Sequence, residues 1–316
     1  MIRGLVTVAI GPLLASCAAV PAPPLAAPQP EIAITIDDLP VHAPFPPGIT
    51  PNQVNDQMIA ALKAGGVPAI GFVNGIGVEQ HPETIQALRD WRAAGFVLGN
   101  HTWSHPSLSK LSLADWENEL TKNEPLLAPL DGNTDWRWFR YPFLDEGKDE
   151  AQNVAARQIL AKHGYRIADV TIGWGDWMFT GAWARCNAAH NTAAVAELGR
   201  IYMDAARENI PVARETAHLL YGRDIPYVLL MHVSAMSAHM MPQVIKMYRD
   251  AGFRFVSIAQ AESDPAYRND VDLSLPPRTP DLKLAQEKGV TLPQMPDLQP
   301  KLNAMCPDSK AATTSP

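Results

Sequence analysis

Apolar runs alternate with amphipathic segments through most of this chain. In chain order, the apolar runs are EIAITI, VPAIGFVN, FVLGNHT, WRWFRYPF, RIADVTIG, IPYVLLMHV and FRFVSI. Each is short and carries few charges, which is typical of strands that are buried on both faces of a parallel sheet. The segments between them have apolar residues at helical spacing and predict helices over residues 52–64, 82–94, 113–127, 149–163, 188–209 and 242–251.

This alternation predicts an α/β fold. Strand and helix units that repeat from residue 31 to residue 262 favour a distorted (β/α) barrel of about seven parallel strands in one domain. A doubly wound open sheet is the alternative, but no glycine-rich fingerprint follows the first strand. Beyond residue 262 the alternation stops and proline recurs, so residues 263–316 are expected to form an irregular tail along the domain surface.

The amino-terminal residues indicate export. Met1 and Arg3 precede an apolar run that ends in Leu-Ala-Ser-Cys at residues 14–17, which resembles the bacterial lipobox. We therefore expect a signal peptide over residues 1–16, lipidation of Cys17, and an extended Ala/Pro-rich tether over residues 17–30. An ordinary signal peptide cut near Ala18 or Ala19, which would remove Cys17, is the alternative. The expected location is the periplasm, with a lipid anchor in the outer membrane.

Charge and cysteine content narrow the picture further. The formal net charge of −7 argues against a nucleic-acid partner, and no protein partner is predicted. Without Cys17, the cysteines that remain are Cys186 and Cys306. In an oxidising compartment this pair could form a disulfide, and two buried free thiols are the alternative.

Polar residues gather where the predicted strands end. Asp37 and Asp38 close the first strand with no Lys or Arg beside them, although adjacent carboxylates repel each other. His101 and His105 follow another strand, four residues apart. Two imidazoles and a carboxylate are a common ligand set for catalytic zinc, so a divalent metal, with zinc as the expected ion, would supply the missing positive charge.

Other strand ends carry further candidate groups. They are Asn74, the segment Arg140 to Phe143, Asp169 or Asp176 with Trp177, and His232. A parallel barrel brings the carboxyl ends of its strands to one face, so these groups are expected to meet there.

Taken in order, these residues resemble the five motifs of the polysaccharide deacetylase family, also called carbohydrate esterase family four. The matching segments are Asp37-Asp38, His101-Thr-Trp-Ser-His105, Arg140-Tyr-Pro-Phe143, Asp176-Trp177 and Leu230-Met-His232. The resemblance spans residues 31 to 260. The family's fold is a distorted β/α barrel, which agrees with the alternation of strands and helices.

The resemblance implies a role for each residue. Asp37 would be the general base, oriented by Arg140, and His232 would be the general acid, supported by Asp176. The implied metal ligands are Asp38, His101 and His105. Substrate would contact the motif residues Tyr141, Phe143 and Trp177, with the Phe143 backbone N–H in the oxyanion hole and Trp177 walling the acetyl pocket.

The implied activity is hydrolysis of acetyl groups on a glycan. The leading expectation is a metal-dependent N-deacetylase acting on an envelope or extracellular polysaccharide, either peptidoglycan or a chitin-like polymer. The alternatives are an O-acetyl esterase of the xylan type, a glycan-binding lipoprotein without turnover, and an amidase for a small non-sugar substrate.

Three motif positions depart from the family pattern. Leu39-Pro40 and Leu144 stand where glycine is usual, and Gly173 stands where another aspartate is common. The segment 178–222 is also longer than a simple β/α unit needs. These departures affect the rim of the groove and could alter substrate preference. His42, close after the first motif, has no assigned role.

Overall fold

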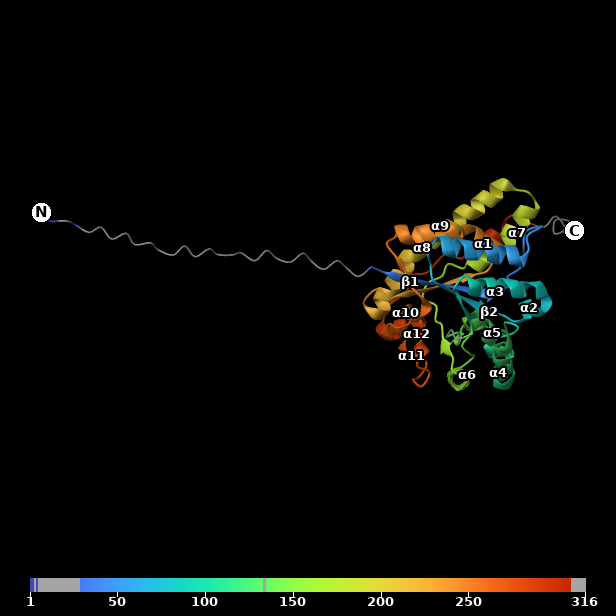
Figure 1. Cartoon of the computed structure of the whole chain (residues 1–316), viewed down its shortest axis with the longest axis horizontal. Helices are drawn as coiled ribbons and strands as arrows, with labels where there is room; N and C mark the ends of the chain where they lie inside the picture. Colours follow the sequence, from blue (N-terminus) through green and yellow to red (C-terminus); the bar gives the residue numbers. More distant parts are fainter. Residues whose placement is uncertain (3, 5–28, 133–134, 308–316) are drawn as a thin grey trace.

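The computed structural model describes residues 1–2, 4, 29–132 and 135–307, and it contains a curled sheet of parallel strands (Figure 1). The strands are β1 (Glu31–Leu39), β2 (Ala69–Val73), β3 (Val97–Asn100), β4 (Trp138–Phe139), β5 (Arg166–Ile167), β6 (Tyr227–His232) and β7 (Arg254–Phe255). Their order is β5-β4-β3-β2-β1-β6, and β7 pairs with the start of β1.

The register of strand β1 against β6 determines which polar residues lie side by side at the end of the sheet. Its residues from Ile32 to Asp37 pair with Tyr227 to His232 of β6, so Asp37 lies directly beside His232. An isolated parallel bridge between Ile172 and Leu229 brings the segment after β5 against the free edge of β6. The sheet thereby curls round on itself. This arrangement confirms the predicted distorted barrel in a single domain.

Helices surround the sheet (Figure 1). They are α1 (Pro51–Ala64), α2 (Ile76–Gln80), α3 (Ile85–Ala93), α4 (Leu113–Lys122), α5 (Glu124–Asp131), α6 (Glu150–Lys162), α7 (Phe179–Ala188), α8 (Thr192–Tyr221), α9 (Ala235–Asp250), α10 (Ile258–Ala261), α11 (Arg268–Val271), α12 (Asp281–Lys288) and α13 (Gln299–Ala304). Short 3₁₀ turns are η1 (Pro82–Thr84), η2 (Leu108–Lys110), η3 (Pro142–Leu144), η4 (Asp176–Met178) and η5 (Pro265–Tyr267).

Several helix boundaries differ from the predicted ones, and proline explains most of the differences. The helix expected over 113–127 is two helices that meet at Asn123, with Pro125 in the first turn of α5. Conversely, Pro211 lies inside α8 and Pro242 lies inside α9. The expected start of α9 at residue 242 is therefore wrong, because Ser234 caps this helix more than a turn earlier.

The long segment 178–222 forms α7 and α8 rather than one helix over 188–209. Asn191 separates the two helices and caps α8 by accepting a hydrogen bond from the backbone N–H of Ala194. The second helix then runs to Gly222, whose φ of 75° lies in the left-handed region that favours glycine at helix ends.

The carboxy-terminal tail is more regular than predicted. It contains η5, α11, α12 and α13, so the expectation of an irregular segment is wrong there. Its residues still pack on the barrel, since Arg278 pairs with Asp169 at 2.8 Å. A disulfide joins Cys186 of α7 to Cys306, with a Cα–Cα distance of 5.2 Å, and decides between the two alternatives for these cysteines.

The amino-terminal predictions fall on another part of the chain. Cys17 and most of the predicted signal peptide and tether lie outside the described residues. Among the described residues, none of the helices has the length and apolar character required to cross a bilayer.

Candidate active site

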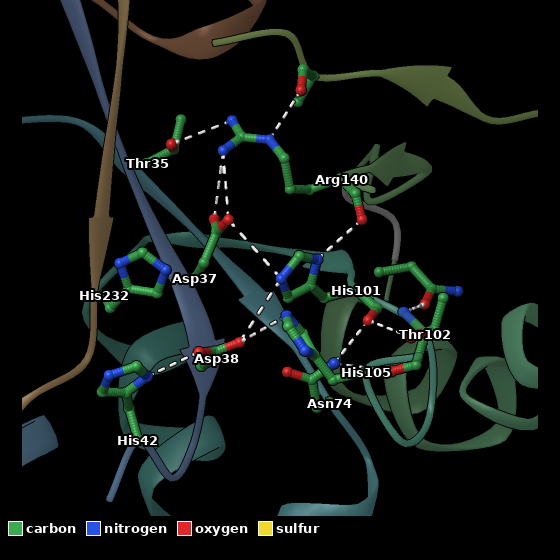
Figure 2. A network of polar contacts seen from close by, with 12 residues as sticks. Thr35, Asp37, Asp38, His42, Asn74, His101, Thr102, His105, Arg140 and His232 are labelled. Atoms are coloured by element: carbon green, nitrogen blue, oxygen red, sulfur yellow. Dashed lines mark hydrogen bonds and ion pairs between the residues drawn. The ribbon is translucent and has the colours of Figure 1, made fainter. Parts of the chain in front are cut away.

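Asp38 and two histidines converge at the carboxyl end of the sheet (Figure 2). Asp38 Oδ1 lies 3.5 Å from His101 Nε2 and 3.4 Å from His105 Nε2. The three possible ligand atoms, one from each residue, all lie within 4.8 Å of one another. Two imidazole nitrogens and one carboxylate oxygen at this separation could hold a single divalent ion and leave coordination positions open.

The polar atoms of this triad fit a metal. Asp38 Oδ1 is buried and has no hydrogen-bond partner among the described residues, which is costly unless a cation satisfies it. Burial would raise the pKa of Asp38, but the hydrogen bond from His42 and the charges of His232 and His101 outweigh it and hold the pKa far below its usual range. Burial and the nearby His101 lower the pKa of His105 to about 4. The carboxylate and the neutral imidazole are the protonation states that bind metal.

The backbone holds His101 in the orientation that a metal ligand needs. Its Nδ1 lies 2.8 Å from the carbonyl oxygen of Arg140, so Nδ1–H donates there and Nε2 is left as the free ligand atom. The Asn74 amide donates to the His101 carbonyl at 2.5 Å and braces the turn that follows. Thr102 and His105 have φ angles of 64° and 58° in that turn. The chain therefore bends back sharply enough for both imidazoles to face Asp38.

Asp37 lies against Arg140, and its Oδ2 is also 3.7 Å from Nε2 of His101, one of the two imidazoles that face Asp38. Arg140 Nη1 lies 3.4 and 3.3 Å from the two carboxylate oxygens of Asp37. The guanidinium is 1% exposed and donates its remaining hydrogen bonds to Thr35 Oγ1 and to the carbonyl oxygens of Ala168 and Asp169. A buried cation with every side occupied fixes the Asp37 carboxylate in one place.

On the other flank, His232 is held by Asp176. Asp176 accepts hydrogen bonds from the His232 backbone N–H and ring Nδ1, both at 2.8 Å, and from the Ser237 hydroxyl at 2.7 Å. Burial alone would lower the pKa of His232, but the charge and hydrogen bond of Asp176 raise it to about 9. A protonated imidazole therefore stands beside Asp37 at neutral pH.

The two aromatic residues of the third motif differ in their exposure to solvent. Phe143 is 69% exposed, has a φ of 60°, and packs its ring edge on His105 at 4.4 Å between centroids. Tyr141 is buried and stacks on Trp116 at 5.9 Å. The structure therefore corrects the expectation of a substrate contact by the Tyr141 side chain, because the ring points into the core instead of the cleft.

A cavity of about 270 Å³ adjoins the site. It is bordered by Leu144, Gly173, Asp176, Trp177 and Leu230, among others. Trp177 is half exposed at this border. Leu144 and Gly173 are two of the positions that depart from the family pattern, so these departures change the wall of a cavity beside His232 and leave the polar groups of the site in place.

Several functional contacts escape a motif-based analysis. Thr35 holds Arg140 and Ser237 holds Asp176, but neither belongs to a motif. The position of Thr35 near the site could have been predicted, because it lies two residues before Asp37 and so shares its face of the strand. Asp169 was the alternative to Asp176 as the acid at this strand end, yet it pairs with Arg278 and only its carbonyl reaches Arg140.

Comparison with known proteins points to one family. Residues 25–168 match the family model described as Polysaccharide deacetylase. A peptidoglycan-N-acetylglucosamine deacetylase from Bacillus cereus is 33% identical over 102 residues, which cover 32% of this chain and 32% of that protein. A chitin deacetylase from Colletotrichum lindemuthianum is 31% identical over 151 residues, which cover 46% of this chain and 52% of that protein.

The aligned region spans between about a third and a half of each of these curated relatives. The solved chitin deacetylase structure from Colletotrichum lindemuthianum matches with a TM-score of 0.51 and 22% identity, covering 74% of this chain and 88% of that chain, which shows a shared fold. The family model and the curated relatives support the polysaccharide deacetylase family for this chain. The match to the family model ends before Asp176 and His232, so the placement of these two residues rests on geometry.

Proposed function

We propose that this protein is a metal-dependent hydrolase that removes N-acetyl groups from an envelope or extracellular polysaccharide, with peptidoglycan or a chitin-like polymer as substrate. One observation carries the proposal. Two adjacent carboxylates have different principal partners. Asp38 Oδ1 lies 3.5 and 3.4 Å from the Nε2 atoms of His101 and His105, whereas Asp37 lies 3.3 Å from a buried guanidinium and farther, at 3.7 Å, from His101. That division suits one ligand and one base, and a turn-forming acid pair would not require it.

Asp38, His101 and His105 would hold the metal. A bound divalent ion, with zinc as our expectation, would lower the pKa of a water and polarise the acetyl carbonyl. The Asp37 carboxylate, held by Arg140, would accept the proton of the attacking water. The backbone N–H of Phe143 would donate to the oxygen on which negative charge develops.

The leaving group needs a separate acid. A sugar amine leaves only when it is protonated, and His232 would donate that proton from its ring while Asp176 holds Nδ1. Asp37 and His232 lie side by side on β1 and β6, so base and acid flank the same small volume. Trp177 would cover the acetyl group at the edge of the adjoining cavity.

The location belongs to the same proposal. We infer that the protein is exported and lipidated at Cys17, and that the Ala/Pro-rich segment tethers the barrel in the periplasm near the outer membrane. Replacing Cys17 with serine should release the protein from the membrane fraction. Unchanged fractionation would contradict lipid anchoring.

Acetate release tests the reaction directly. The full chain would be incubated with peptidoglycan, chitooligosaccharides and acetylated xylan, before and after chelator treatment and after zinc is restored. We expect release from the N-acetylated glycans that chelator abolishes and zinc restores. Release from xylan alone would identify an O-acetyl esterase, and metal binding without any release would identify a glycan-binding protein. The surface variant Asp250→Asn should behave as the wild type.

A further inference from the structure

We propose that His42 is a positioning residue that orients Asp38 toward the metal, an inference that rests on the metal site of the proposed function. His42 lies four residues after Asp38, and its Nδ1 is 2.7 Å from Asp38 Oδ2 (Figure 2). An ionised carboxylate only accepts hydrogen bonds, so Nδ1–H of His42 is the donor. No motif of the family resemblance includes His42.

The contact divides the two oxygens of Asp38. Oδ2 accepts from His42, whereas Oδ1 faces the Nε2 atoms of His101 and His105. With Oδ2 occupied, the carboxylate cannot rotate freely about its axis, and Oδ1 is the oxygen that remains for the metal. Partners of this kind fix the orientation of a ligand and raise metal affinity.

The loop that carries His42 is itself anchored in the core. The buried Asn55 donates hydrogen bonds at 2.9 Å to the carbonyls of Pro40 and Pro51, and Trp91 donates to Asn55 at 2.8 Å. Pro40 belongs to the segment that replaces the family's usual glycine. The departure at Leu39-Pro40 thus belongs to a fixed loop that returns the His42 side chain to Asp38.

His232 limits the His42 ring from the other side. The two ring centroids are 5.0 Å apart with an interplanar angle of 44°. The His42 side chain is 17% exposed, so most of it is enclosed between Asp38 and His232. His42 thereby contacts both the metal ligand and the proposed acid, and these two contacts restrict the orientation of its ring.

Two substitutions separate the hydrogen bond from the volume of the ring. His42→Phe keeps a flat ring and removes the donor, whereas His42→Asn keeps an amide N–H close to the position of Nδ1. We expect His42→Phe to weaken zinc affinity about 10- to 100-fold and His42→Asn to recover most of the loss. The control is His81→Phe, which replaces an exposed histidine and should leave the zinc Kd unchanged.

The measurement is the zinc Kd of each full-length variant, taken by competition with a chromophoric chelator, together with the unfolding temperature of the metal-free protein. A zinc Kd in His42→Phe equal to the wild-type value would overturn the inference, as would a loss confined to the unfolding temperature. If wild type binds zinc but releases no acetate, the proposed reaction fails and the Kd comparison still decides the role of His42. If wild type binds no zinc, both fail.

Discussion

Replacing Asp176 with asparagine should move the alkaline limit of activity to lower pH. Asp176 is buried and is the largest influence that raises the pKa of His232 to about 9 against the opposing effect of burial. Asparagine has nearly the same size but carries no charge. Without the carboxylate, burial is opposed only by the charges of Asp38 and Asp37, and the pKa of His232 should fall toward the usual value of about 6.5.

The size of the effect follows from these two values. A fall from about 9 to about 6.5 corresponds to roughly 3 kcal/mol of lost stabilisation of the imidazolium. At pH 8 the protonated fraction of His232 would fall from about nine-tenths to about 3%. Because the proposed acid must be protonated, kcat/KM at pH 8 should decrease about 30-fold from protonation alone.

The assay is the pH profile of kcat/KM for acetate release, from pH 5 to pH 10. Ser237→Ala is the matched control, because it removes one hydrogen bond to Asp176 and leaves the charge in place. Its alkaline limb should stay close to that of wild type. An alkaline limb in Asp176→Asn that coincides with the wild-type limb would refute the assignment of His232 as the acid held by Asp176.

Two further predictions concern stability. Arg140→Met leaves Asp37 buried without its cation and should lower the free energy of unfolding in urea by about 3–5 kcal/mol. The control Arg200→Met removes a surface ion pair and should change the free energy of unfolding little. Equal stability of the two variants would contradict a stabilising buried pair of Arg140 and Asp37. The double variant Cys186→Ser/Cys306→Ser should lose about 2–5 kcal/mol, because the disulfide closes a loop with a sequence separation of 120. Wild type should lose the same amount in reducing agent, and a reductant-insensitive wild type would contradict the bond.

The pattern of strands predicted the barrel correctly, whereas proline residues led to wrong predictions of helix boundaries. Apolar runs such as Tyr227–His232 have to be buried on both faces, so their presence in the sequence specifies a parallel sheet. Pro242 suggested a helix start, yet Ser234 begins α9 earlier and the helix continues through the proline. Capping by a serine hydroxyl and packing on neighbouring helices together outweigh the free-energy cost of a proline inside a helix. A short stretch of sequence does not reveal the tertiary packing, so the proline alone led to the wrong boundary.

Site residues at the ends of strands could be predicted from the sequence. Residues that act on the site by holding another side chain were harder to predict. Asp37 and His232 share a register because both end strands of one sheet. Tyr141 was misassigned because its motif position says nothing about which way the ring points. His42 and Ser237 reach the site through loop and helix geometry, which depends on contacts such as that of Asn55 with Pro40 and cannot be obtained from spacing alone.

The central claim is that Asp37 and Asp38 have different tasks. It is tested most directly by measuring bound zinc and acetate release in parallel for Asp37→Asn and Asp38→Asn. Asp37→Asn should retain one zinc per chain and lose about 10²- to 10⁴-fold in kcat, because only the base is removed. Asp38→Asn should lose zinc and activity together. Full activity in Asp37→Asn, or wild-type zinc affinity in Asp38→Asn, would contradict the division of the two carboxylates.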